Sequence, residues 1–285
     1  MFTTILGLLI LMLVFLGIVS LVRNLLANSR DKKLAQTAQH VRKHSEEQRA
    51  SMRKARRKIR DDYLDSLRIS WYQIVLIFVI GSVAGLILEE TWMYFTAHLT
   101  ESRVGLVWGP FSPLYGFGAT LLTLITFAMR KRGVKPLAVF LVAVLVGGSL
   151  EEITGWGMEH LFHVSSWTYE YLPDHITKYI AWRFLFFWGL LGLIWYKYVM
   201  PNLLYTIGAP STKRGAVFVA LLALYLGVDI FMTLAVFTRM EQRNQGIPAT
   251  NDFDKYLDAN YSDKWIENRF QNMVVETQPR DVSHA

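Results

Sequence analysis

The apolar residues of this chain are gathered into long blocks, and most of the charged residues lie between the blocks. A helix needs about 20 mostly apolar residues to cross a bilayer, and a charge placed at its centre costs about 2.5–3.5 kcal/mol. The pattern therefore predicts an all-α polytopic membrane protein and argues against one water-soluble globule. The six predicted transmembrane helices are Phe2–Val22, Trp71–Phe95, Tyr115–Met129, Leu137–Phe162, Phe184–Val199 and Ala216–Phe237.

The first block allows two interpretations. Phe2–Val22 carries no charge, and it lacks both the basic stretch and the small-residue cleavage site of a secretory signal. We therefore expect a retained transmembrane helix, with a cleaved signal peptide as the alternative.

Basic residues are concentrated in every second connection between the blocks. Residues 23–68 hold 14 Lys and Arg against 6 Asp and Glu, and further basic residues lie at 130–135 and 197–214. Because basic loops stay on the cytoplasmic side, these three segments are predicted to be cytoplasmic. The other loops and the acidic tail at 238–285 then lie outside. We thus expect a multi-pass protein of the plasma membrane with both termini extracytoplasmic.

These assignments divide the chain into five parts. They are an N-terminal transmembrane anchor (1–22), a basic cytoplasmic helical linker (23–70), a four-helix membrane core (71–205), the sixth transmembrane helix (206–237) and an acidic, partly disordered extracytoplasmic tail (238–285). The linker is rich in helix-forming residues, and we interpret it as a basic helix beside anionic lipid headgroups. Coiled-coil self-association and nucleic-acid binding are the alternatives, and we expect no nucleic acid.

Two segments of the membrane core resemble each other. A glycine stands four residues before a Glu-Glu pair at both 85–90 and 147–152, and Arg-x4-Trp-Gly follows at 103–109 and at 183–189. Each unit holds two helices, so two copies would share one orientation and be related by an axis along the membrane normal. The predicted internal two-helix parallel repeat comprises residues 71–129 and 137–199.

Charged side chains also lie within the outer halves of the apolar blocks, where they persist if they face a partner or a cavity. One interpretation is a set of ion pairs that lock the bundle, because arginine binds a carboxylate through two parallel hydrogen bonds. The other is a polar site open to the outer side, because carboxylates outnumber arginines and the remainder could bind a cation or carry protons. The candidate substrate- or ion-binding residues are Glu89, Glu90, Arg103, Glu151, Glu152, Glu159 and Arg183, and Asp229 lies at similar depth.

A segment rich in glycine and proline precedes the third block. Residues of these types at this density do not fit a regular helix, so they predict a loop or broken helix that enters the membrane. A helix beginning after Pro113 would point its free N–H groups outward toward Arg103 and favour an anion, and a tight turn is the alternative. The residues of this structural site loop are Gly109, Pro110, Pro113, Tyr115, Gly116 and Gly118.

Several kinds of chemistry are absent from the sequence. The chain has no cysteine, which excludes thiolate metal sites and cysteine nucleophiles. It has no GxxxxGK[ST] phosphate loop, so it does not hydrolyse ATP by that route. Glu159, His160 and His163 could form a weak metal site, but histidines three residues apart are common. We expect no metal and no cofactor, assign no catalytic residue and favour a function other than catalysis.

The membrane core resembles a known family. The shared motifs are Gly85-x3-Glu89, Arg103-x5-Gly109-Pro110-x2-Pro113-x-Tyr115-Gly116-x-Gly118, Glu151-x2-Thr154-Gly155-x3-Glu159-x-Leu-Phe162, Trp167-x-Tyr169 and Arg183-x4-Trp188-Gly189. They are similar to those of the ABC-transporter type IV (CmpB-like) family of prokaryotic membrane proteins, over about residues 74–205. The resemblance implies a permease that works with a separate ABC-type ATPase. The first block, the basic linker and the tail are additions to the family pattern, and Thr168 replaces its aspartate.

The motifs and the charge pattern favour a transporter or permease for a small polar or ionic solute. One alternative is a membrane enzyme or lipid-handling protein, in which Arg103 and Arg183 would clamp a phosphate headgroup. Another is a scaffold that holds partners through the linker and the tail. The expected partners are the lipid bilayer, an ABC-type ATPase and further copies of the chain in a homo-oligomer.

Overall fold

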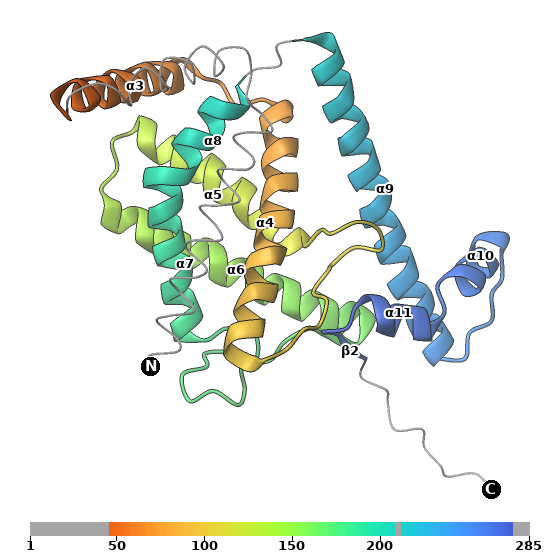
Figure 1. The fold of residues 1–285 in the computed structure, drawn as a ribbon. Helices are drawn as coiled ribbons and strands as arrows, with labels where there is room; N and C mark the ends of the chain where they lie inside the picture. The colour runs from red at the N-terminus through yellow and green to blue at the C-terminus, as the bar shows by residue number, and fades with distance from the viewer. Residues whose placement is uncertain (1–45, 209–211, 276–285) are drawn as a thin grey trace, which may run out of the picture.

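The structure is a computed structural model that describes residues 46–208 and 212–275 (Figure 1). Within these ranges, four helices are long and apolar enough to cross a membrane. They are α4 (Trp71–Ala97), α6 (Pro136–Phe162), the continuous helix Trp182–Ile207 and α9 (Lys213–Asn244). The predicted third block forms α5 (Pro113–Lys131), which is not among these four, and Phe2–Val22 lies outside the described residues. The prediction of six spans is therefore supported for four of them and not confirmed as a whole.

The helix at the predicted fifth block extends to Ile207 through a widened turn. Its parts are α7 (Trp182–Ile194), the π-helical turn η1 (Trp195–Val199) and α8 (Met200–Ile207). Pro201 has no N–H for the carbonyl four residues earlier, which explains why the widened turn precedes it. In this turn, the Trp195 indole donates to Thr123 Oγ1 of α5 at 2.9 Å.

Local sequence signals set the helix ends. Pro113 and Pro136 begin α5 and α6, where a first-turn N–H would have no partner in the helix. In the first turn of α4, Gln73 Oε1 accepts the Ser70 N–H at 2.9 Å. The amide of Gln73 donates to the Gly208 carbonyl at 2.8 Å, which ties the beginning of α4 to the end of α8.

α4 packs against α5 through small residues. A Cβ added at Gly81 would lie 2.4 Å from Ala119 Cβ, and one added at Gly85 would lie 2.2 Å from Tyr115 Cβ. Distances this short are well below van der Waals contact, so only glycine lets the two helices approach so closely.

α6 packs against α7 in the same manner. A Cβ added at Gly192 would lie 2.1 Å from Ala143 Cβ, and one added at Gly147 would lie 2.1 Å from Trp188 Cγ. Both helix pairs therefore combine one small-residue contact with one aromatic ring packed over a glycine.

One end of the bundle carries the basic segments. The helix α3 (Glu46–Ser66) lies across this end beside α8 (Figure 1). Arg130, at the end of α5, forms an ion pair with Asp61 at 3.0 Å, and Lys131 donates to the Leu67 carbonyl at 2.8 Å. The described part of the basic linker and the basic connection after α5 thus share one side of the bundle.

The described part of the tail is folded at the opposite end of the bundle (Figure 1). It forms α10 (Asp252–Asn260), α11 (Asp263–Arg269) and β2 (Val274–Val275), which pairs antiparallel with β1 (Val164–Ser165). These elements bury apolar side chains against the adjacent ends of α4 and α9 and the loop between α4 and α5. The buried tail residues are Leu257, Tyr261, Ile266 and Phe270.

The outward faces of α6 and α9 are apolar. Exposed leucine, valine, isoleucine and phenylalanine side chains recur along both helices, as expected for surfaces in contact with lipid. Examples are Leu137, Leu141, Leu145 and Ile153 on α6 and Val217, Leu221, Leu224 and Phe231 on α9.

Candidate functional site

The segment Arg103–Ser112 is an irregular loop that folds back between α4 and α9. Its chain reverses through Gly109, whose φ of 69° favours glycine, and the Gly105 N–H donates to the Phe111 carbonyl at 2.8 Å. The Ser112 N–H donates to the Ser82 carbonyl, near the middle of α4, at 3.3 Å. The loop therefore reaches the depth of the middle of α4, where irregular backbone needs partners within the protein.

α9 supplies partners for the loop backbone. The Val107 N–H donates to Thr233 Oγ1 and the Trp108 N–H donates to Asp229 Oδ1, each at 2.9 Å. Asp229 is fully buried, and its Oδ2 has no hydrogen-bond partner among the described residues. These bonds satisfy buried backbone groups that would otherwise destabilise the loop.

The tail supplies the other partner of the loop. Arg269 Nη2 donates to the Leu106 carbonyl at 2.9 Å and to the Gly109 carbonyl at 2.5 Å. Burial lowers the pKa of the Arg269 guanidinium, and the negative charge of Asp229 opposes this shift. Arg269 and Thr233 were not among the predicted site residues, because no sequence signal links them to a loop more than 120 residues away.

Glu89 and Glu90 both hold Arg103, through different atoms. Arg103 Nη1 lies 2.8 Å from Glu89 Oε1, and the Arg103 backbone N–H donates to Glu90 Oε1 at 3.1 Å. The Arg103 side chain is only 11% exposed, and its Nε has no acceptor among the described residues. The adjacent carboxylates at the end of α4 therefore fix the beginning of the loop.

A second carboxylate reaches the same region from α6. Glu151 is 8% exposed and accepts the Trp188 indole N–H at 3.0 Å, while its other oxygen has no partner among the described residues. The surrounding protein shields the Tyr169 hydroxyl and raises its pKa, and the charges of Glu151 and Glu89 raise it further. Tyr115 interacts electrostatically with the same two carboxylates. Glu89 and Glu151 thus act electrostatically on the same pair of phenol groups.

Arg183 lies elsewhere. Its guanidinium binds Asp174 in the loop after α6, with Nη2 2.6 Å from Oδ1, and almost half of the side chain is exposed. This bond holds the pKa of Asp174 below its ordinary value. Arg103 and Arg183 are therefore bound to different carboxylates and do not form the two-arginine clamp that a phosphate-binding site would need.

Glu152 and Glu159 hold the loop after α6 in place. Glu152 Oε2 accepts the Thr177 hydroxyl at 2.6 Å. Glu159 Oε2 accepts the Tyr179 hydroxyl at 2.6 Å and lies 2.6 Å from Lys178 Nζ. Of the seven predicted site residues, the structure groups Glu89, Arg103 and Glu151 with Glu90 beside them. The others bind residues of the loop after α6.

The remaining glycine and proline residues of the predicted loop have different surroundings. Pro113 begins α5, and Pro110 is exposed. A Cβ added at Gly116 would lie 2.3 Å from Ser82 Oγ, and one at Gly118 would lie 3.2 Å from the Trp188 ring. The two glycines therefore allow α5 to approach both α4 and α7.

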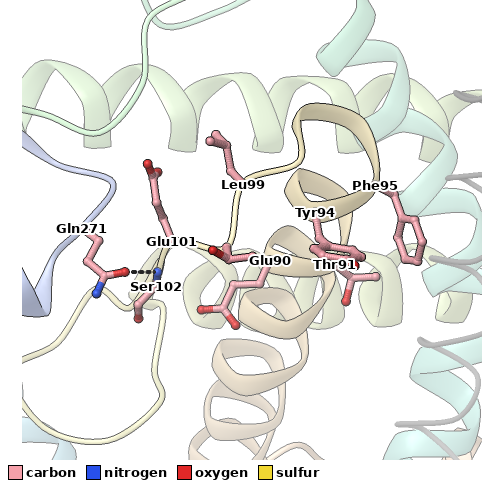
Figure 2. A pocket seen from close by; sticks show the side chains of 9 residues that line it. Glu90, Thr91, Tyr94, Phe95, Leu99, Glu101, Ser102 and Gln271 are labelled. Atoms are coloured by element: carbon pink, nitrogen blue, oxygen red, sulfur yellow. Dashed lines mark hydrogen bonds between the residues drawn. The ribbon is translucent and has the colours of Figure 1, made fainter.

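A surface pocket of about 690 Å³ opens at the C-terminal end of α4, next to the Glu89–Arg103 pair. Figure 2 shows Phe95 of α4 and Gln271 of the tail on opposite sides of it, and the Ser102 N–H donates to Gln271 Oε1 at 2.8 Å. Glu90 connects the pocket to the pair, because it lines the pocket and also binds the Arg103 backbone. The lining residues are Glu90, Thr91, Tyr94, Phe95, Leu99, Thr100, Glu101, Ser102 and Gln271.

Residues 76–234, which are more than half of the chain, match the protein family described as Putative ABC-transporter type IV. The chain belongs to this family. The matched region extends from α4 into α9, so it includes Glu89, Arg103, Glu151 and Asp229 but neither α3 nor the tail helices. No curated protein and no solved structure matches the chain. The family and the four apolar helices together identify a membrane protein of ABC-transporter type.

Proposed function

We propose that the chain is the permease-type membrane component of a transporter and that Glu89, Arg103 and Glu151 bind a small polar or ionic solute. The observation that carries this proposal is that carboxylates from α4 and α6 act on the same two tyrosine hydroxyls, beside the Glu89–Arg103 pair. Membership of the family supports the transport role. The charges and the helix packing around Glu89 and Glu151 support the position of the site.

The charges of this region favour a ligand over a purely structural ion pair. Arg103 neutralises Glu89, whereas Glu151 receives one hydrogen bond from a neutral indole, and its other oxygen has no partner in the part of the chain that the structure describes. A buried carboxylate with an unsatisfied oxygen is costly, so its retention implies a partner that is bound for part of the time. A proton or a cationic group of the solute would be such a partner.

We also propose that the two helix pairs are copies of one unit. Gly147 of α6 lies 62 residues after Gly85 of α4, and Trp188 of α7 lies 73 residues after Tyr115 of α5. In each pair the aromatic ring packs over the glycine. Trp108 is not the counterpart of Trp188, because it lies in the irregular loop and its backbone N–H donates to Asp229 of α9.

The same alignment relates the two central carboxylates. Glu89 follows its glycine by four residues, and Glu151 does the same in α6. Glu89 interacts with the aromatic residue of its own pair, Tyr115, and Glu151 binds Trp188. A site between two copies with the same orientation has the geometry expected for a transporter built from parallel repeats.

The orientation follows from the basic end of the bundle. Loops rich in Lys and Arg remain cytoplasmic, so α3 and residues 130–135 would lie on the cytoplasmic side of the cell membrane. The solute site and the surface pocket would then lie toward the outer side. An ATPase partner, which the family description implies, would bind at the α3 end, and a homo-oligomer remains a prediction.

Ligand binding to the purified chain tests the proposal without assuming an energy source. A bound ligand raises the unfolding temperature, so a panel of small organic cations, anions and zwitterions can be screened by thermal shift. We expect one class to stabilise the wild type and to lose this effect in both Glu89→Gln and Glu151→Gln. Glu267→Gln, a substitution of an exposed tail carboxylate, is the matched control and should retain the effect. Absence of any shift in the wild type, or an unchanged shift in both variants, would overturn the proposal.

A further inference from the structure

The helix α3 is anchored to the bundle by its C-terminal turns. Leu64 is 1% exposed, and the Tyr63 ring contacts the Tyr205 ring of α8 edge to face at 5.5 Å. Arg60 Nη1 donates to Asn202 Oδ1 of α8 at 3.1 Å. The face of α3 that carries Leu64 is thus the face that rests on the end of the membrane bundle.

The N-terminal turns of α3 extend past α8 and lie across the direction of α4 and α9 (Figure 1). At 100° per residue, Arg57 and Arg53 lie within about 20° of the direction of Leu64, two and three turns earlier. The face that rests on the bundle at one end of α3 therefore continues as an arginine face beyond the bundle. With α4 and α9 crossing the membrane, the bilayer surface would lie below that face beyond α8.

Arg53 and Arg57 are available to a ligand there. Both side chains are exposed, and neither forms an ion pair with a residue that the structure describes. Trp71, half-exposed at the beginning of α4, lies close to the end of α3 in sequence and is typical of the membrane interface. This position puts α3 at the level of the lipid headgroups.

We propose that Arg53 and Arg57 bind the phosphate groups of anionic phospholipids in the leaflet where α4 begins. An arginine fork matches a phosphate through two parallel hydrogen bonds, and the negative potential of an anionic leaflet attracts basic residues within about 10 Å of its surface. A soluble acidic protein or a nucleic acid would not need the arginines on the face that rests on the bundle. This proposal does not depend on the solute site.

A label on the same face of α3 can measure the local lipid composition. Because the chain has no cysteine, Ala50→Cys gives a single labelling site, and position 50 lies about 40° from the direction of Leu64. The labelled protein is reconstituted in vesicles of phosphatidylcholine with 30% phosphatidylglycerol (about a third, a typical anionic fraction). Energy transfer is then compared for phosphatidylglycerol and phosphatidylcholine that carry the same acceptor on an acyl chain.

Two double variants distinguish lipid binding by one face of α3 from an effect of its net charge. Arg53→Ala with Arg57→Ala should reduce the ratio of the two transfer efficiencies from well above one to about one. Lys54→Ala with Lys58→Ala removes the same charge from positions about 80–120° from the direction of Leu64. This variant should leave the ratio near the wild-type value. Both double variants keep the anchoring residue Leu64, and circular dichroism checks their folding.

Each outcome decides the proposal. An unchanged ratio in the arginine variant, or an equal loss in the lysine variant, would overturn it. The proposal would also be overturned if energy transfer in the wild type did not distinguish the two lipids but changed when an acidic protein or RNA was added. Loss of lipid preference in the arginine variant alone would support it.

Discussion

Substitution of Gly147 by alanine tests the contact that positions the central carboxylate of α6. The added Cβ would lie 2.1 Å from Trp188 Cγ, whereas ordinary contacts begin near 3.4 Å, so the indole must move by about 1.3 Å. That movement separates Trp188 Nε1 from Glu151, whose only described hydrogen bond is this one at 3.0 Å. Gly147→Ala should therefore affect both packing and the polar site.

The expected loss of stability combines three effects. Overpacking a closely packed contact costs about 1–3 kcal/mol. Loss of a buried hydrogen bond to a charged group costs about 1.5–3 kcal/mol. Alanine gains roughly 0.5–1 kcal/mol over glycine within a helix. The net destabilisation should thus be about 1.5–5.5 kcal/mol.

Gly157→Ala is the matched control on the same helix, because a Cβ added there meets no atom within 4 Å. Unfolding in one detergent, followed by circular dichroism as denaturant increases, compares the two variants with the wild type. Gly157→Ala should be neutral or slightly stabilising and Gly147→Ala clearly destabilised. Equal stability of the two variants would refute the packing of Trp188 over Gly147.

Two further predictions concern the tail. The Arg239 hydrogen bonds lower the pKa of Asp258 to about 2, so this pair should stabilise the tail fully above the ordinary pKa near 4 and lose its effect as the pH falls toward 2. The contribution is roughly 1–2 kcal/mol with allowance for solvent, and amide exchange in α10 should show it between pH 5 and pH 2.5. The effect should be smaller in Arg239→Met, where Arg243 still binds Asp258. Arg269→Met should free the Leu106 and Gly109 carbonyls and speed amide exchange in residues 103–112 more than tenfold, about the effect of one lost hydrogen bond to a charged group, while α10 stays protected. Exchange that stays slow in that loop would show that α4 and α9 hold it without Arg269.

The membrane helices were predictable because hydrocarbon imposes a strict requirement on composition. α4, α6, α7 with α8, and α9 follow from apolar length alone. α5 is less apolar, and its threonines at 120, 123 and 126 are buried and donate to their own helix backbone. A helix surrounded by other helices needs fewer lipid-compatible side chains, which explains its weaker signal.

The candidate site was predictable only in part. Charges within apolar blocks identify Glu89 and Glu151 as unusual, because membrane depth makes any charge costly, and Arg103 lies in the connection between two blocks. Their partners depend on tertiary contacts. The Arg-x4-Trp-Gly motif marks Trp188, but nothing in the sequence shows that Trp188 binds Glu151 or that Asp174 takes Arg183 away from the site.

The similarity of the two Arg-x4-Trp-Gly segments illustrates this limit. Residues 103–109 form part of an irregular loop held by α9 and the tail, whereas residues 183–189 lie within α7. Identical spacing in a loop and in a helix places side chains differently. The glycine of each Gly-x3-Glu segment, in contrast, packs against an aromatic ring of the partner helix in both pairs.

Cross-linking between α4 and α6 tests most directly whether the two central carboxylates face one region. The absence of native cysteine lets Glu89→Cys be paired with Glu151→Cys without further changes, and Glu90→Cys with Glu151→Cys serves as the control. A short bifunctional thiol reagent, applied in membranes, should link 89 to 151 efficiently and 90 to 151 poorly, because Glu90 faces the surface pocket. Efficient linkage of the control pair together with no linkage of 89 to 151 would contradict a shared site.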